Sequence, residues 1–367
     1  MPVPFNDLTR QYRAHQEAFD EAVAGVVRTQ QFILGPAVKR FEEELARYHG
    51  TAHGIGVANG TDAIVLALQA LGVGPGDEVV VPALSFVASA TAVARTGATI
   101  RFVDVEPVTY TIDCALAARA CGPKTRAILP VHLYGQMADM ESLSALCAKR
   151  SIPMVEDAAQ AIGATYGGRK AGTFGAAGCF SAYPGKNLGA WGDAGFVVTA
   201  DAGLAERIRM LREHGSRRKN WAEAYGLNSR LDSLQAAVLS VKLPLLDGWN
   251  RARASVAARY DEAFKGLPMQ RPSVAAGRSH TYHQYVLCLQ RRDALKTHLE
   301  SRGVQSQIYY TDPLHLQPCF KGLGYKSGDC PVAERVCREN LAIPVFPEMT
   351  DAEVREVADA VRSFFKA

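Results

Sequence analysis

The feature that most constrains the fold is an alternation of short apolar runs with amphipathic helical patterns between about residues 44 and 199. Two of the helical patterns are Asp62–Leu71 and Leu143–Lys149. Strands that alternate with helices are typical of a mostly parallel sheet covered on both faces. The pattern therefore predicts an α/β domain built on a seven-stranded sheet. The candidate strands are Gly54–Ala58, Glu78–Val81, Thr99–Val103, Ala127–Val131, Pro153–Glu156, Gly178–Ser181 and Gly195–Thr199.

A change in the pattern after about Leu246 predicts a second, smaller α+β domain. A helix rich in Arg and Ala is followed by a stretch containing Pro and Gly, one strand-like run and two further helices. We therefore predict a large domain of residues 1–246 and a small domain of residues 247–367, which suits a chain of 367 residues. The elements expected in the small domain are the helix Gly248–Phe264, the strand Tyr282–Leu289, and the helices Arg292–Arg302 and Asp351–Phe365.

Composition argues against several classes of protein. The 41 Lys and Arg residues nearly balance the 37 Asp and Glu residues, so we expect no nucleic-acid partner. Apolar runs fall short of the ~20 residues that span a bilayer, and the polar N-terminus does not resemble a signal peptide. The eight cysteines are scattered without a C-x-x-C pair. They predict reduced thiols, a cytoplasmic location and no metal site.

Polar or glycine residues follow most of the candidate strands. They are Asn59-Gly60, Ser85, Asp104, His132 and Asp157. Ligands of open α/β sheets bind outside the carboxyl ends of the strands, so we expect these residues to share one site.

Asp157 and Lys186 are the strongest candidates for chemistry at that site. A carboxylate at the buried end of a strand needs a partner, and a protonated pyridine nitrogen would supply one. A lysine on the loop after the next strand can reach the same crevice, where desolvation would lower its pKa. Each residue also has an ordinary interpretation, because a strand-end Asp is often only a helix cap and a lysine after Pro-Gly is often solvated.

The segment Asn59-Gly60-Thr61-Asp62 is a candidate phosphate site, because it follows a strand and opens a helix. Gly60 would allow close approach of an anion, Thr61 would cap the helix, and Ser181 would add a hydroxyl. An ordinary helix cap is the alternative. Two rival nucleotide motifs fail: the glycines from Gly54 to Gly60 are wrongly spaced for a dinucleotide fingerprint, and Asn187 follows Lys186 where a Walker A loop has Ser or Thr.

Several segments together resemble the DegT/StrS family of sugar aminotransferases. The similarity runs from Phe5-Asn6-Asp7-Leu8 to Pro313-Leu314-His315-Leu316-Gln317-Pro318. Its most specific segments are Asn59-Gly60-Thr61-Asp62-Ala63, Pro130-Val131-His132-Leu133-Tyr134-Gly135-Gln136, Glu156-Asp157-Ala158-Ala159-Gln160 and Gly226-Leu227-Asn228-Ser229-Arg230. The resemblance implies the fold type I of pyridoxal-phosphate-dependent transferases, with pyridoxamine phosphate as the intermediate form of the cofactor.

The resemblance also implies residue roles. Lys186 forms the Schiff base, Asp157 holds the pyridinium nitrogen, Gln160 lies against the phenolic oxygen and Phe86 stacks on the ring. Gly60, Thr61, Asp62 and Ser181 take the phosphate, and Asn228 reaches the phosphate of the neighbouring subunit in a homodimer. We expect substrate contacts from Arg217, Arg218 and Lys219, whose clustered charges suit a diphosphate, and from Tyr310 and His315.

The implied reaction moves an amino group from L-glutamate to a keto-sugar linked to dTDP or UDP. The segment from Tyr183 to Ala190, followed by Gly192-Asp193, is similar to the branch that aminates 3-keto sugars. A 4-keto-sugar aminotransferase and a sugar dehydratase of the same fold remain alternatives, although the best-known dehydratases have histidine at the position of Lys186. A cofactor-binding regulator without enzymatic activity and a nucleotide-dependent oxidoreductase are alternatives from other functional classes. Three departures from the family, Ala182, Ala194 and Thr311, bear on the fit of the sugar.

Overall fold

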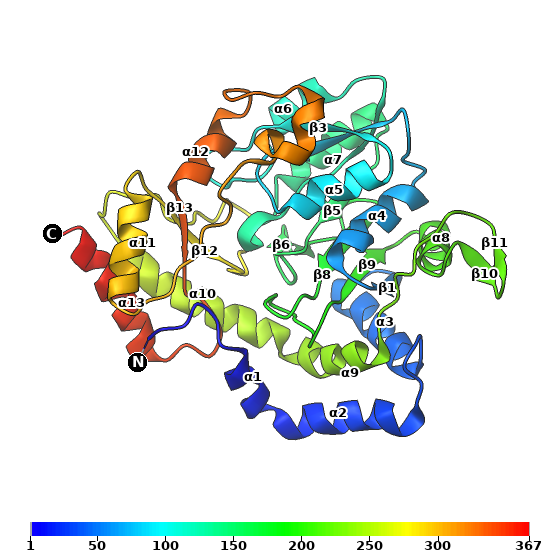
Figure 1. Cartoon of the computed structure of the whole chain (residues 1–367), viewed down its shortest axis with the longest axis horizontal. Coiled ribbons are helices and arrows are strands. Elements are labelled where there is room, and N and C mark those ends of the chain that lie inside the picture. The colour runs from blue at the N-terminus through cyan, green and yellow to red at the C-terminus, as the bar shows by residue number, and fades with distance from the viewer. Residues whose placement is uncertain (1, 367) are drawn as a thin grey trace.

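A seven-stranded sheet forms the centre of the computed structural model, which describes residues 2–366 (Figure 1). Three strands have the order β3-β2-β4 and four have the order β1-β9-β8-β5. Parallel bridges from Ile128 to Met154 and from Val131 to Asp157 join β4 to β5. The bounds are β1 His53–Val57, β2 Glu78–Pro82, β3 Thr99–Val103, β4 Thr125–Ile128, β5 Val155–Asp157, β8 Ala177–Ser181 and β9 Gly195–Thr199.

All seven predicted strands are present, and the prediction of a mostly parallel sheet is confirmed. β9 runs antiparallel to both of its neighbours, β8 and β1. The remaining pairs of neighbours are parallel. The parallel arrangement brings the ends of β5 and β8 to one edge, so the segments that follow Asp157 and Ser181 lie together.

Helices cover the sheet and bury its apolar residues. α4 is the most deeply embedded, since eight of its residues are buried between the sheet and neighbouring helices. The helices of this part are α1 Leu8–Ala14, α2 Gln16–Thr29, α3 Pro36–His49, α4 Gly60–Ala70, α5 Val87–Arg95, α6 Cys114–Ala120, α7 Met140–Arg150, α8 Ala202–Arg212 and α9 Ser233–Lys242. Two short hairpins are β6 Thr165–Tyr166 with β7 Arg169–Lys170, and β10 Ser216–Arg218 with β11 Trp221–Ala222.

The C-terminal part is built around the long helix α10, which runs away from the sheet (Figure 1). β12 pairs antiparallel with β13, a strand that the sequence analysis missed together with α12. A separate core cluster there includes Tyr260, Tyr285 and Phe364. The elements are α10 Leu246–Ala263, β12 Tyr285–Cys288, α11 Arg292–Ser301, α12 Pro331–Glu339, β13 Asn340–Ile343 and α13 Asp351–Phe364, with 3₁₀ turns η1 Leu133–Gly135, η2 Leu243–Leu245, η3 Leu314–Leu316 and η4 Pro318–Leu323.

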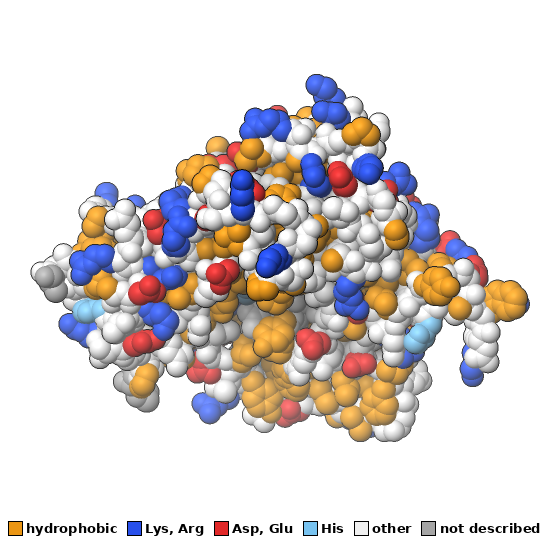
Figure 2. Space-filling view, turned by 45° about the horizontal axis from the view of Figure 1, so that its top comes forward, with side chains coloured by type: hydrophobic (Ala, Val, Ile, Leu, Met, Phe, Trp, Pro, Cys, Tyr) orange, Lys and Arg blue, Asp and Glu red, His pale blue; other side chains and the backbone are white. Residues whose placement is uncertain are grey.

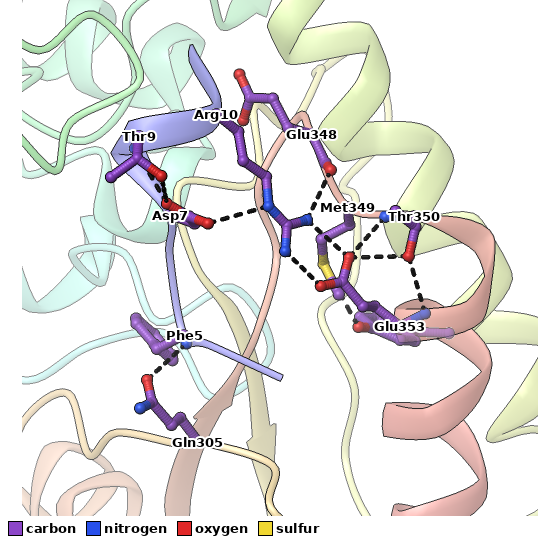
Figure 3. Close-up of polar contacts among 10 residues, drawn as sticks. Phe5, Asp7, Thr9, Arg10, Gln305, Glu348, Met349, Thr350 and Glu353 are labelled. Atoms are coloured by element: carbon purple, nitrogen blue, oxygen red, sulfur yellow. Dashed lines mark hydrogen bonds and ion pairs between the residues drawn. The ribbon is translucent and has the colours of Figure 1, made fainter. Parts of the chain in front are cut away.

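The N-terminal segment packs against this C-terminal part rather than against the sheet. Val3 pairs with Val304 and belongs to the same core cluster as Tyr260. Figure 3 shows Arg10 between Asp7 and Glu353, with two guanidinium nitrogens 2.8 and 2.6 Å from the Glu353 carboxylate. The division into residues 1–246 and 247–367 stays a prediction, and its outer ends, Met1 and Ala367, lie outside the described residues.

Within residues 2–366, no helix is both long enough and apolar enough to cross a membrane.

Candidate active site

Asp157 ends β5 at the carboxyl edge of the sheet and is almost completely buried. Its Oδ2 accepts a hydrogen bond from the Ser89 hydroxyl at 2.6 Å, and its Oδ1 accepts one from the backbone N–H of Ala159 at 3.2 Å. Turns rather than a helix follow Asp157, so it is not a helix cap. Two neutral donors compensate a buried carboxylate only in part, which leaves the site suited to a cationic ligand group.

Lys186 lies on the loop between β8 and β9. Burial lowers the pKa of its ammonium group from the ordinary value to about 8, and the Asp157 carboxylate acts in the opposite direction. The two residues therefore lie close enough for their charges to interact. A pKa near 8 leaves a substantial fraction of Lys186 as free amine near neutral pH, which a nucleophile or base needs.

Gln160, Tyr310 and Phe86 line the same region. The Gln160 amide nitrogen donates to the Tyr310 hydroxyl at 2.9 Å, and its oxygen accepts the backbone N–H of Tyr134 at 2.8 Å. The rings of Phe86 and Tyr310 are 6.0 Å apart. Phe86 is the capping residue before α5, and its side chain is 54% exposed. An exposed ring beside buried polar groups offers a stacking surface to a planar ligand.

The start of α4 approaches the end of β8 very closely. A Cβ atom placed on Gly60 would lie 2.6 Å from the Cβ of Ser181, so glycine is needed there for steric reasons. Asn59 is the capping residue, because its side-chain oxygen accepts the N–H of Asp62 at 2.8 Å. The predicted cap at Thr61 is therefore wrong. Thr61 lies inside the first turn, where backbone N–H groups and the helix dipole favour an anion.

Asp62 is a poor candidate for the phosphate. Its backbone N–H donates to Asn59, and its carboxylate lies 3.6 Å from a guanidinium nitrogen of Arg95. Both polar groups thus have protein partners, and a carboxylate repels an anion. The contacts support Gly60, Thr61 and Ser181 as phosphate ligands and give no support to Asp62.

The predicted diphosphate contacts lie on a hairpin that projects from the body of the chain (Figure 1). Arg217 pairs with Glu206 and Glu223, and the Arg218 guanidinium lies 4.5 Å from the centre of the Trp221 ring. Lys219 is exposed at the turn between β10 and β11. The hairpin stands apart from the central sheet that carries Asp157 within this chain.

The side chains of three polar residues predicted to line the site are bonded to other partners inside the protein. His315 is 1% exposed, and its Nε2 is 3.2 Å from the Glu334 carboxylate, so it packs inside the protein and cannot contact a substrate there. Asp104 accepts hydrogen bonds from the first N–H groups of α12, at Val332 and Ala333. His132 is fully buried against Glu156. The partner of each side chain, which the sequence does not show, keeps its polar atoms from the site.

Two of the family departures also face the interior. Ala182 and Ala194 are fully buried, and the Ala182 N–H donates to the Ala194 carbonyl at 2.8 Å. They belong to the core at the end of β8 and the start of β9, so neither side chain is exposed to a sugar, and the expectation that they alter its fit stays a prediction. Thr311 is exposed.

The sequence analysis missed Ser89, which bonds Asp157, and His283, which contacts the residue after Lys186. Ser89 had a weak signal, because Ser85 and Ser89 are one helical turn apart in an otherwise apolar segment. His283 had no such signal in the sequence, since it lies almost a hundred residues from Lys186 in the chain.

The candidate site combines a buried carboxylate, a lysine with a lowered pKa, an exposed aromatic ring and a helix start whose N–H groups suit an anion. Residues 13–362 match the DegT/DnrJ/EryC1/StrS aminotransferase family. The chain belongs to this family. The predicted fold type I of pyridoxal-phosphate-dependent transferases is confirmed, and so is the enzyme class, aminotransferase.

Relatives of this aminotransferase cover its full length. A pleiotropic regulatory protein of Geobacillus stearothermophilus is 46% identical and aligns with 100% of this chain and 99% of its own. A dTDP-3-amino-3,4,6-trideoxy-alpha-D-glucose transaminase of Streptomyces venezuelae is 45% identical, with 99% and 96% covered. The crystal structure of S. venezuelae DesV in complex with a ketimine intermediate has a TM-score of 0.98 at 44% identity, with 100% and 99% covered.

The cofactor of the family is pyridoxal phosphate, and solved relatives hold it or its pyridoxamine form. The residues of this aminotransferase fit such a group. The partly compensated carboxylate of Asp157 suits a protonated ring nitrogen, and Phe86 presents an exposed ring for stacking. The approach of Gly60 to Ser181 forms a cradle that a Cβ would fill. The structure therefore agrees with the cofactor that the resemblance implies.

Proposed function

We propose that this aminotransferase moves an amino group from L-glutamate to a 3-keto-hexose linked to dTDP or UDP, in the biosynthesis of an amino sugar. The observation that carries the proposal is the presence of Lys186, whose pKa is lowered to about 8, and the buried carboxylate of Asp157 at the same edge of the sheet. The substrate class rests on the name of the S. venezuelae transaminase, which specifies a 3-amino sugar on dTDP.

The chemistry that pyridoxal phosphate supplies when bound is an aldehyde for the amino group and a ring that withdraws electrons. Asp157 would hold a proton on the ring nitrogen, because its carboxylate is buried and its donors are neutral. Gln160 would orient the ring through its amide, which Tyr134 and Tyr310 hold in place. Gly60, Thr61 and Ser181 would bind the phosphate.

Lys186 would act as the base. With a pKa near 8, its Nζ can take the proton from the amino-bearing carbon of glutamate and return it on the other side of the transfer. The same atom serves the second half of the reaction with the keto-sugar, since the proton then moves in reverse. One lysine thus suffices for both halves.

We propose further that the working enzyme is a homodimer with shared sites. Asn228 is exposed, and within residues 2–366 its side chain has no hydrogen bond. Trp221 and Tyr225 are 57% and 102% exposed, unusual for large aromatic side chains. Figure 2 shows hydrophobic and basic side chains together on the projecting hairpin. A second subunit would cover these rings and receive Asn228, Arg218 and Lys219 beside its own cofactor.

A turnover screen of purified protein tests the function. Glutamate is offered with dTDP- and UDP-linked 3-keto and 4-keto sugars, and NMR locates the new amine. Amination at carbon 3 supports the proposal, and amination only at carbon 4 replaces it with the 4-keto alternative. Loss of water without transfer of nitrogen would identify a dehydratase. Bound cofactor without any turnover would favour a regulatory role, as the name of the Geobacillus relative allows.

A further inference from the structure

Asn187, the residue after Lys186, is held from three directions. Its side chain is buried, and its Nδ2 donates to Asn250 Oδ1 at 2.8 Å and to the Thr281 carbonyl at 3.1 Å. Its Oδ1 is 3.1 Å from Nδ1 of His283. Asn250 lies on α10, and Thr281 and His283 precede β12. The loop that carries Lys186 is therefore tied to the C-terminal part of the chain.

These contacts fix the orientation of each amide. The Thr281 carbonyl can only accept a hydrogen bond, so the group of Asn187 that faces it must be the NH₂. Asn250 is fixed in the same way, because its Nδ2 donates to the Ile162 carbonyl at 3.0 Å. Its oxygen is then the group that faces Asn187. Neither side-chain amide can exchange the positions of its oxygen and nitrogen without placing two hydrogen-bond acceptors against each other.

The orientation of Asn187 in turn fixes the tautomer of His283. The Asn187 oxygen faces Nδ1, so Nδ1 must carry a proton and donate it. Burial, Lys186 and two further basic groups, Arg253 and His280, hold the pKa of His283 well below its ordinary value. His283 is thus neutral, with its proton on Nδ1 and an electron pair on Nε2 that faces the Gln284 amide nitrogen at 3.5 Å. Because His283 is bonded to the residue next to Lys186, it packs against the loop that carries the catalytic amine.

We propose that His283 and Asn187 are positioning residues for Lys186. The hydrogen bonds run from Asn250 through Asn187 to the Nδ1 proton of His283, and they hold the Lys186 amine in its desolvated place. The proposal rests on the role of Lys186 in the proposed function. It assigns a task to a histidine that does not contact Asp157 or the phosphate cradle.

Two substitutions at one position separate this role from simple packing. In His283→Asn the side-chain NH₂ occupies the place of Nδ1 and can still donate to Asn187. In His283→Gln the NH₂ occupies the place of Nε2, and the bond to Asn187 is lost. Asn187→Leu tests the other end, since leucine has a similar volume, removes all three hydrogen bonds and adds no charge beside Lys186. Asn187→Leu also provides the test if His283→Gln does not fold.

The measurement is the pKa of Lys186 in the full-length chain freed of cofactor. Competitive acetylation across a pH series, followed by mass spectrometry of the peptide containing Lys186, reports the free amine without any turnover. We expect His283→Asn to titrate near the wild type. In His283→Gln and Asn187→Leu, Lys186 should titrate at higher pH, nearer the ordinary lysine value of 10.5. Each unit of increase makes Lys186 about tenfold less reactive at pH 7.

A matched control is His298→Gln, the same exchange at a histidine of α11 whose Nε2 contacts Ala360 and Ser363. It should leave the titration of Lys186 unchanged. Equal titration of His283→Asn and His283→Gln, whether shifted or not, would overturn the proposal, and so would a shift in the His298 variant. Because labelling needs no substrate, a failed turnover screen leaves this result standing.

Discussion

Replacing Asp157 with asparagine should lower turnover and the pKa of Lys186 together. The exchange keeps the shape of the side chain. Its Oδ1 can still accept the N–H of Ala159, and the Ser89 hydroxyl can donate or accept, so both hydrogen bonds can survive. The negative charge is what disappears. The variant therefore isolates the electrostatic contribution of Asp157 from its part in packing.

The loss of charge acts on two groups in different ways. The ring nitrogen of the cofactor loses its ionic partner, and removal of such a group costs at least about 10²-fold in turnover, or about 2.7 kcal/mol in the barrier. Lys186 loses the one interaction that raises its pKa, so its amine should titrate below about 8. More free amine would then accompany less activity.

Steady-state turnover with glutamate measures the first effect, and competitive acetylation of the cofactor-free chain measures the second. Thermal unfolding of both proteins checks that the fold is retained. Turnover within a few fold of the wild type would show that Asp157 only organises the turn at Ala159. An increase in the pKa of Lys186 would show that the two side chains do not interact as the structure indicates.

Three further predictions concern other parts of the chain. Borohydride reduction and peptide mapping should place the pyridoxyl group on Lys186, and recovery of the label on any other lysine would exclude Lys186 as the catalytic residue. Mixing inactive Lys186→Ala and Asn228→Ala subunits should restore some activity once subunit exchange is shown, and a fully active monomer in sedimentation would refute the shared site. Arg10→Ala should lower the free energy of unfolding by about 2 kcal/mol at pH 7, because its bonds to Glu353 are charge-assisted. Those bonds lower the pKa of Glu353 to about 2, so their contribution is present above the ordinary value of 4.5 and is lost as pH falls through 2. Denaturant unfolding of both proteins should therefore converge at low pH, and a constant difference down to pH 2 would show that the ion pair is not its cause.

Local patterns in the sequence were enough to predict the sheet and to select the two central residues of the candidate site. Each strand is a short apolar run whose side chains are buried by helices close in the chain, so the runs keep their identity in the fold. Asp157 ends β5 and Lys186 follows β8, its parallel neighbour in the sheet, and the geometry of parallel strands brings their carboxyl ends to one edge.

Only the tertiary structure decided which polar residues join that edge. Asp104 and His315 look like site residues in the sequence, but Asp104 caps α12 and His315 is buried against Glu334. Asn187 and His283 show the opposite case, since 96 positions separate them in the chain and a single hydrogen bond joins them in the fold. The direction of a side chain and its distant partners depend on packing between elements. The periodicity within one segment carries no information about that packing. The strands and the residues at their ends could therefore be predicted, whereas the contact between Asn187 and His283 could not.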